Sequence, residues 1–386
     1  MKSGWVTKKL GEVCEEIRER ISSADVPLSA YITTDNMLKN CAGVCEAENL
    51  PPKICSLVTY RSGDILLSNI RPYLKKIWLA DRNGGASSDV IVLRPRLEYA
   101  FPRYIYRVLA RDQFFDYSML NVTGTKMPRG KRDWIKSFEI PIPPLAEQKR
   151  IVAKIDAAFE KIDALKANAE KNLANAKELF QSALDEAMRP KKGWVEKRLG
   201  EVCETTSGGT PIKSRPEYYE GGTIPWLRSG EVCRKDITES EMFITKLGMS
   251  NSSAKMMPKD TVLIAMYGAT AAQSGILRFA STTNQAICGI LPSQQFLPEF
   301  LYYYFKKIES QLAARAQGGA QPNISQQKIR ETPVPVISLD LQQKIVERLN
   351  QATKCIETLQ QNYARQIADC AEMRQAILRE AFEGRL

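Results

Sequence analysis

The stretch Gly4-Trp5-Val6-Thr7-Lys8-Lys9-Leu10-Gly11-Glu12-Val13-Cys14-Glu15 returns later in the chain as Gly193-Trp194-Val195-Glu196-Lys197-Arg198-Leu199-Gly200-Glu201-Val202-Cys203-Glu204, with ten of the twelve positions identical. A second block, Ile140-Pro141-Ile142, returns as Val334-Pro335-Val336. Repeats this far apart are typical of duplicated domains rather than of short stacked repeats. The 386 residues are therefore predicted to form two copies of one unit, each able to bury its own core. The alternative is a tandem duplication in which the two copies do not act as a functional pair.

A long amphipathic helix is predicted after each copy of the second block. Residues recur at alternating steps of four and three, which is the heptad pattern of a coiled coil. The first seam is Gln148, Val152, Ile155, Phe159, Ile162, Lys166, Ala169, Leu173, Ala176, Phe180, Ala183 and Ala187, and the second is Gln342, Val346, Leu349, Thr353, Ile356, Gln360, Tyr363, Ile367, Cys370, Arg374, Ile377 and Ala381. A helix over residues 145–189 would be roughly 65 Å long. Helices of this length bury an apolar stripe by pairing, and we expect these two to pair antiparallel with each other.

Composition narrows the possible functions. Lys and Arg number 55 against 44 Asp and Glu, so the formal net charge is +11 and the pI is near 9.1, which favours a polyanionic partner. The chain contains no histidine, which removes histidine-dependent catalytic triads and metal motifs. It also lacks the glycine motifs that bind nucleotide phosphates and the Asn/Asp-Pro-Pro-Tyr motif of amino-methyltransferases. Any associated catalysis is therefore expected on partner subunits.

Two further features concern the location of the protein and its cysteines. No run of about 18 apolar residues occurs, and the N-terminal residues do not resemble an export signal, so we expect a soluble, cytoplasmic protein. None of the nine cysteines has the Cys-x-x-Cys spacing of zinc and redox sites. Cys41, Cys45 and Cys55 are accordingly expected to be small core residues, and no bound metal is predicted.

Several blocks of the second copy carry a family resemblance. Their order and spacing are similar to those of the specificity subunits of type I restriction-modification systems, and the resemblance covers essentially the whole chain. The blocks are Thr206-Ser207-Gly208-Gly209-Thr210-Pro211, Tyr218-Tyr219, Gly221-Gly222-Thr223-Ile224-Pro225-Trp226-Leu227-Arg228-Ser229-Gly230-Glu231, Met266-Tyr267-Gly268-Ala269-Thr270, Asn284-Gln285-Ala286 and Gly318-Gly319-Ala320-Gln321-Pro322-Asn323-Ile324-Ser325.

The resemblance implies two mixed α/β target-recognition domains in tandem, separated by two long antiparallel helices and related by a pseudo-twofold axis. We expect recognition domains over residues 1–143 and 191–337, and conserved spacer helices over 144–190 and 338–386. Each domain would read one part of an asymmetric site in double-stranded DNA. Two methylase subunits and the restriction subunits would be partners, with S-adenosylmethionine, ATP and magnesium bound by them. The chain itself would be non-catalytic and would hold no cofactor.

The candidate DNA-contacting residues lie in loops that differ between the copies. Arginine pairs well with guanine and the amides of Asn and Gln pair well with adenine, while lysine suits phosphate. In the first copy the candidates are Asn69, Arg71, Tyr73, Lys75, Lys76, Lys126, Arg129, Lys131 and Arg132. In the second copy they are Lys213, Ser214, Arg215, Arg228, Gln317, Gln321, Asn323, Gln326 and Gln327.

Other interpretations remain open at this stage. The basic loops are also what a solvated charge run looks like, and glycines near Thr210 and Asn323 are also what tight turns require. Trp5, Trp194 and Trp226 lie beside apolar neighbours, so core positions are expected for them. The rival functions are a free-standing nuclease or methylase, which would need a cofactor or metal motif, and a coiled-coil adaptor that reads no DNA.

Overall fold

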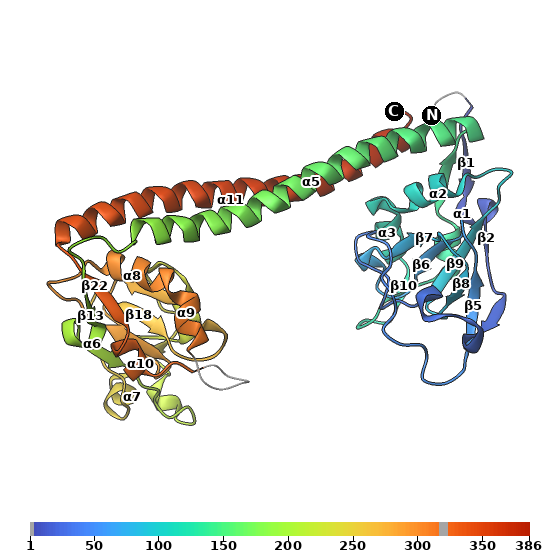
Figure 1. Cartoon of the computed structure of the whole chain (residues 1–386). Helices are drawn as coiled ribbons and strands as arrows, with labels where there is room; N and C mark the ends of the chain where they lie inside the picture. Colours follow the sequence, from blue (N-terminus) through green and yellow to red (C-terminus); the bar gives the residue numbers. More distant parts are fainter. Residues whose placement is uncertain (1–3, 316–322) are drawn as a thin grey trace. The chain divides into compact units, whose positions relative to one another are not determined.

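The computed structural model describes residues 4–315 and 323–386 and divides into two compact units. The first unit comprises Met1–Glu170 and Ala364–Leu386, and the second comprises Lys171–Tyr363. Each unit contains one globular domain together with part of each of the long helices α5 (Leu145–Ala187) and α11 (Leu339–Phe382) (Figure 1). Both helices therefore form where the heptad pattern predicted them.

The first domain is a mixed α/β fold built on two four-stranded sheets. One sheet has the order β2 (Cys14–Glu16), β9 (Val90–Pro95), β6 (Ile65–Ser68) and β7 (Ile77–Leu79), and the other has the order β3 (Arg20–Ser22), β5 (Ser56–Tyr60), β8 (Gly84–Ala86) and β4 (Tyr31–Ile32). Helices α1 (Leu10–Val13), α2 (Pro102–Leu109), α3 (Asp112–Met119) and α4 (Arg132–Lys136) accompany them, with a short hairpin of β10 (Val122–Thr123) and β11 (Arg129–Gly130) before α4. Every residue of β6 is buried, as is usual for a short apolar run.

The second domain repeats this arrangement. Its larger sheet has the order β14 (Thr205–Ser207), β21 (Ile287–Ile290), β18 (Val262–Ala265), β19 (Ser274–Leu277) and β16 (Asp236–Ile237), and its smaller sheet has the order β17 (Phe243–Ile244), β15 (Ile224–Leu227) and β20 (Thr282–Thr283). Helices α6 (Leu199–Val202), α7 (Lys246–Ser250), α8 (Pro298–Lys307), α9 (Glu309–Ala314) and α10 (Gln326–Arg330) complete it. One sheet of each domain has the same strand order, β2-β9-β6-β7 in the first and β14-β21-β18-β19 in the second, as two copies of one fold should, whereas the other sheets differ in the number and order of their strands.

The two repeated sequence blocks pair with each other within each domain. In the first domain β1 (Val6–Lys9) runs antiparallel to β12 (Glu139–Ile142), with Val6 opposite Ile142. In the second domain β13 (Val195–Arg198) runs antiparallel to β22 (Pro333–Val336), with Val195 opposite Val336. This ribbon brings the start and the end of each domain together immediately before the long helix. The repeated residues therefore form the ribbon that joins the two ends of each domain next to the start of the long helix.

A buried glutamine fixes the first turn of each long helix to its domain. The amide oxygen of Gln148 accepts a hydrogen bond from the backbone N–H of Phe101 at 2.8 Å, and its amide nitrogen donates to the carbonyls of Tyr99 and Pro143 at 2.8 Å each. Gln342 makes the equivalent three bonds, to Leu297 at 2.9 Å, Gln295 at 2.8 Å and Ile337 at 2.9 Å. Both side chains are fully buried, so their polar atoms depend on these partners.

The predicted seam residues are buried or half-buried, with Lys166 as the exposed exception. Within the first unit, Arg150 near the start of α5 donates to the carbonyl of Leu386 at 2.7 Å, whereas Asp163, further along α5, pairs with Arg374. As the contacts move toward the C-terminal end of α5, they move toward the N-terminal end of α11, so the two helices run antiparallel. In the second unit Glu186 pairs with Arg348 at 2.8 Å in the same sense.

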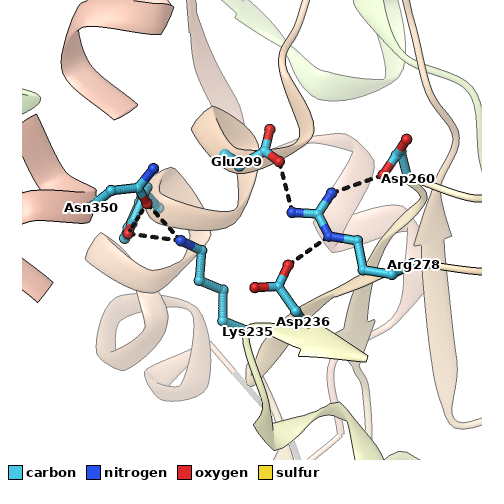
Figure 2. Close-up of polar contacts among 7 residues, drawn as sticks. Lys235, Asp236, Asp260, Arg278, Glu299 and Asn350 are labelled. Carbon is cyan, nitrogen blue, oxygen red and sulfur yellow. Dashed lines mark hydrogen bonds and ion pairs between the residues drawn. The ribbon is translucent and has the colours of Figure 1, made fainter. Parts of the chain in front are cut away.

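Each domain also meets its long helix through polar side chains. In the first domain Arg103 and Arg107 of α2 form ion pairs with Asp156 of α5, at 2.8 and 2.7 Å. In the second domain Lys235 and Tyr303 both bond the amide oxygen of Asn350 on α11, at 2.6 and 2.7 Å (Figure 2). These contacts place α2 and α8 at equivalent positions against the two helices.

The glycine pair Gly208-Gly209 is explained by close contacts rather than by a turn. A Cβ at Gly208 would lie 2.1 Å from the carbonyl oxygen of Thr283, and one at Gly209 would lie 2.3 Å from the backbone nitrogen of Ala254. Neither glycine has a positive φ. Trp226 is 3% exposed and donates from Nε1 to the carbonyl of Gly209 at 2.9 Å, so its predicted core position is confirmed.

Candidate nucleic-acid interface

Two loops that are far apart in the sequence meet in the first domain. The β6–β7 loop, residues 69–76, follows the buried strand β6, and the later loop spans residues 121–131. Ile70 forms a β-bridge with Arg129, the N–H of Arg71 donates to the carbonyl of Pro128 at 2.7 Å, and the N–H of Gly130 donates to the carbonyl of Asn69 at 3.1 Å. The structure thus brings together the two groups of candidate residues that the sequence placed in separate loops.

The second domain joins its equivalent loops by equivalent bonds. Tyr267, in the β18–β19 loop of residues 266–273, forms a β-bridge with Asn323. The N–H of Ile324 donates to the carbonyl of Met266 at 2.9 Å, as Gly130 donates to Asn69 in the first domain. We call this pair of joined loops the loop frame; each domain has one.

The backbone of the β6–β7 loop and that of the β18–β19 loop also agree in conformation. Arg71 and Lys75 have φ values of 51° and 52°, and the equivalent Gly268 and Ala272 both have a φ of 73°. The side chains, in contrast, differ at every one of the eight positions, Asn-Ile-Arg-Pro-Tyr-Leu-Lys-Lys in one loop against Met-Tyr-Gly-Ala-Thr-Ala-Ala-Gln in the other. One backbone frame therefore presents two different sets of side chains.

Three predicted cations of the first frame are exposed and have no side-chain partner among the residues that the structure describes. They are Arg71, Lys126 and Lys131. Tyr73, in the same loop as Arg71, has 49% of its surface exposed. Unpaired cations at converging loops give a positive surface, which suits phosphate groups and the acceptor-rich edge of guanine.

Four other candidates of the first domain already have partners. Lys75 pairs with Asp112 at 2.6 Å, Lys76 donates to the carbonyl of Thr34, Arg129 pairs with Asp89 at 2.8 Å, and Arg132 bonds both Glu16 and the carbonyl of Ser88. Asn69 is only 8% exposed, and its amide oxygen is buried without a hydrogen bond in the described part of the chain. These residues hold the frame in shape.

Glu16 is a residue of the site that sequence reasoning missed. Its side chain is 6% exposed and lies against Arg132 at 2.5 Å, Arg18 at 3.4 Å and Lys136 at 3.5 Å. Burial by itself raises the pKa of Glu16, but the hydrogen bonds and charges of Arg132 and Arg18 outweigh it, so the pKa is lowered from its usual value. Glu16 lies 116 residues before Arg132 in the sequence, so no local pattern indicated the contact.

In the second domain the predicted residues fall into two groups. Asn323 is exposed at the bridge of the loop frame, and Gln326 donates to the hydroxyl of Thr205 at 2.9 Å. Gln327 donates to Glu331 at 2.7 Å. Gln317 and Gln321 lie outside the described residues. The frame also exposes 38% of Tyr267, a residue that was not among the predicted contacts.

The remaining candidates of the second domain lie outside its loop frame. Lys213 and Ser214 are exposed between β14 and β15, and their side chains form no hydrogen bond or ion pair with the described residues. Arg215 pairs with Glu217 at 3.3 Å, and Arg228 pairs with Glu241 at 2.7 Å. Within the described part of the chain, no hydrogen bond or ion pair joins these four residues to Asn323.

The cysteines and the helices complete the description. Cys45 and Cys55 are exposed, so the expectation that they are core residues was wrong, while Cys41 is half-buried and burial raises the pKa of its thiol to about 12. The described residues contain no group of three acidic or cysteine side chains arranged to hold a metal ion. None of the helices in the described ranges is both long and apolar enough to span a bilayer.

Comparison with known proteins identifies the fold. A family model described as the type I restriction modification DNA specificity domain matches residues 2–175 and 191–366. A type I restriction enzyme specificity subunit of Escherichia coli is 29% identical over 269 residues, which are 65% of this chain and 66% of that protein. A specificity subunit of Haemophilus influenzae is 22% identical over 82% of this chain and 86% of its own length.

Two solved structures resemble the whole chain. One, from work on complex assembly and conformational transition of a type I restriction-modification system, has a TM-score of 0.83 at 24% identity and covers 100% of this chain and 99% of that one. The other, the HsdS subunit from Thermoanaerobacter tengcongensis, has a TM-score of 0.62 at 24% identity, covering 100% and 98%. With the family model matched over both halves, the chain belongs to the type I restriction-modification DNA specificity family and carries two specificity domains, as the internal repeat predicted.

Proposed function

We propose that the chain reads a two-part, asymmetric site in double-stranded DNA, one part through the loop frame of each domain. The proposal rests on one observation. The two frames have equivalent backbone hydrogen bonds and equivalent positive-φ positions, but the β6–β7 and β18–β19 loops have a different residue at every position. A scaffold kept constant while its exposed side chains vary is what reading two different base sequences requires. We assign the recognition domains to residues 1–143 and 191–337, and the spacer helices to 144–190 and 338–386.

Partner subunits supply the chemistry in this proposal. Two methylase subunits bind the chain, carry S-adenosylmethionine and modify adenine, and restriction subunits carry ATP and magnesium, all in the cytoplasm. The chain positions them and catalyses nothing itself. Support comes from the repeat, because the largely exposed strands β1 and β13 form the same ribbon in both copies. A surface that recurs in both copies suits a partner that binds twice.

The test is to co-express the chain with the methylase subunit of its own system in an unmethylated host. Modified adenines are then mapped across the genome by single-molecule sequencing. We expect a two-part motif with a fixed gap that appears only when both chains are present. A stable complex that gives no motif would favour the adaptor interpretation, and methylation by the chain alone with labelled cofactor would favour the free-standing enzyme.

The dependence of DNA affinity on salt gives an independent measurement. If about six to eight phosphates are neutralised, the logarithm of the binding constant should fall with the logarithm of salt concentration with a slope of roughly −5 to −7. Binding of the purified complex to a duplex that carries the mapped motif is measured between low and moderate salt. A slope near zero would contradict contact between the basic loops and the DNA backbone.

A further inference from the structure

Arg71 occupies a backbone conformation that the second copy gives to a glycine. Its φ is 51°, and the equivalent Gly268 has a φ of 73°. Residues with a Cβ adopt this left-handed conformation at a cost of roughly 1 kcal/mol, whereas glycine adopts it freely. The first domain therefore keeps an arginine at a position where the fold favours a glycine. Strain of this kind is retained where a side chain is needed at one particular place.

The backbone of Arg71 is held from both sides. Its N–H donates to the carbonyl of Pro128 at 2.7 Å, and its carbonyl accepts from the N–H of Leu74 at 2.9 Å. The preceding residue, Ile70, is bridged to Arg129, and the following Pro72 is buried. The Cα–Cβ direction of Arg71 is consequently fixed by the loop frame, which reduces the freedom that its side chain would lose on binding.

The guanidinium of Arg71 is exposed and has no partner among the described residues. Two neighbouring arginines differ in this respect, because Arg129 is paired with Asp89 and Arg132 with Glu16. An unpaired guanidinium offers two parallel N–H groups, which match the O6 and N7 acceptors of guanine in the major groove. Lys126 and Lys131 offer single charged ammonium groups, which suit phosphate.

From this geometry we infer that Arg71 is the guanine-reading residue of the first recognition domain. This inference rests on the proposed function and adds the residue and the base to it. The paired Arg129 and Arg132 shape the loop, Lys126 contributes to affinity for any sequence, and the second domain has no equivalent reader at Gly268. One guanine in one half of the site therefore depends on a single side chain.

The experiment measures adenine methylation by the full complex on a DNA library in which each motif position is randomised in turn. Arg71→Gly installs the residue of the second copy, and Arg71→Ala removes the guanidinium but keeps a Cβ. We expect both variants to lose their preference for guanine at one position of one half-site, by about tenfold to a hundredfold, with every other position unchanged. Lys126→Ala is the comparison variant, for which we expect uniformly weaker methylation with the same preference.

Each outcome separates the inference from the function on which it rests. A wild-type complex without a two-part motif would contradict the proposed function itself. A motif that is unchanged in Arg71→Ala and Arg71→Gly would overturn the inference and leave the function standing. A change in Arg71→Gly alone would also overturn it, because the effect would then come from the backbone. Thermal unfolding of both variants checks that the first domain is still folded.

Discussion

The two copies build the same backbone but differ in how they satisfy their equivalent polar positions. Three ion pairs of the first domain are replaced by uncharged residues in the second. Arg132 with Glu16 is replaced by the hydrogen-bonded pair Gln326 and Thr205, and Arg107 with Asp156 by the hydrogen-bonded pair Tyr303 and Asn350. The positions of Arg94 and Asp64 are taken by Leu291 and Thr261, and Thr261 donates to the carbonyl of Pro258 instead. In each case both partners differ, so no buried charge is left alone. Both members of a polar pair therefore change together while the fold is kept, because removing one member costs more stability than removing both.

The second domain also has an ionic centre in which one arginine meets three carboxylates. Arg278 pairs with Asp236 at 2.5 Å, Asp260 at 2.8 Å and Glu299 at 2.7 Å (Figure 2). Burial by itself lowers the pKa of Arg278, but the three carboxylates outweigh it and raise the pKa overall. The centre links β16 and β19 to the start of α8. It is a satisfied structural cluster, in contrast to the unpaired cations of the first loop frame.

The largest expected effect tests what the copies share. Gln148→Leu and Gln342→Leu each remove three hydrogen bonds of a fully buried amide, and the backbone groups that it joined lose that partner. We expect each substitution to cost about 3 kcal/mol of unfolding free energy. Amide hydrogen exchange shows which unit is destabilised. Gln343→Leu, at an exposed position on the same helix, is the control and should change stability by less than about 0.5 kcal/mol.

A second test breaks one ion pair and then completes the exchange. Asp64 is 2% exposed and bonds Arg94 twice at 2.8 Å. Asp64→Thr leaves Arg94 without its partner and should cost about 2 kcal/mol, because bonds between charged groups contribute roughly 1.5–3 kcal/mol. Adding Arg94→Leu, which installs the equivalent pair of the second copy, should recover most of the loss in urea unfolding. Additive losses would show that the pair does not act as a unit.

Acid sensitivity should distinguish the domains next. Because the folded pKa of Glu16 is lowered, its contribution to stability is complete above the usual value of 4.5 and is lost as the pH falls through the folded pKa. The equivalent position in the second domain is Thr205, which does not titrate. We expect exchange protection around β2 and α4 to fall below about pH 4.5, and Glu16→Gln to remove this pH dependence. Equal acid sensitivity in the variant would refute the role of Glu16.

The sequence predicted the parts of the molecule in which side chains repeat with a pattern. The heptad seam located both helices, and the repeated blocks located the ribbons, because these features depend on periodic burial. The site was predicted only in part. Arg71 and Arg129 were both candidates, but of the two it is Arg129 that forms an ion pair. Its partner, Asp89, lies forty residues earlier in the sequence. Pairing at that distance leaves no local pattern, and the same is true of Glu16 and Arg132.

The smallest expected effect concerns the equivalent positions Arg71 and Gly268, where both loops have a positive φ but only one has a side chain. A Cβ at Gly268 would meet no atom of the described residues within 4 Å, so Gly268→Ala tests the positive φ. We expect it to cost up to about 1 kcal/mol, and Arg71→Gly to gain a similar or smaller amount, in thermal unfolding of the free chain. Opposite signs at equivalent positions would show that the frame itself favours glycine there, so that the arginine of the first domain persists for what its side chain does. If Arg71→Gly instead destabilised the free chain, the guanidinium would have a structural partner, and the case for base reading would lose its main support.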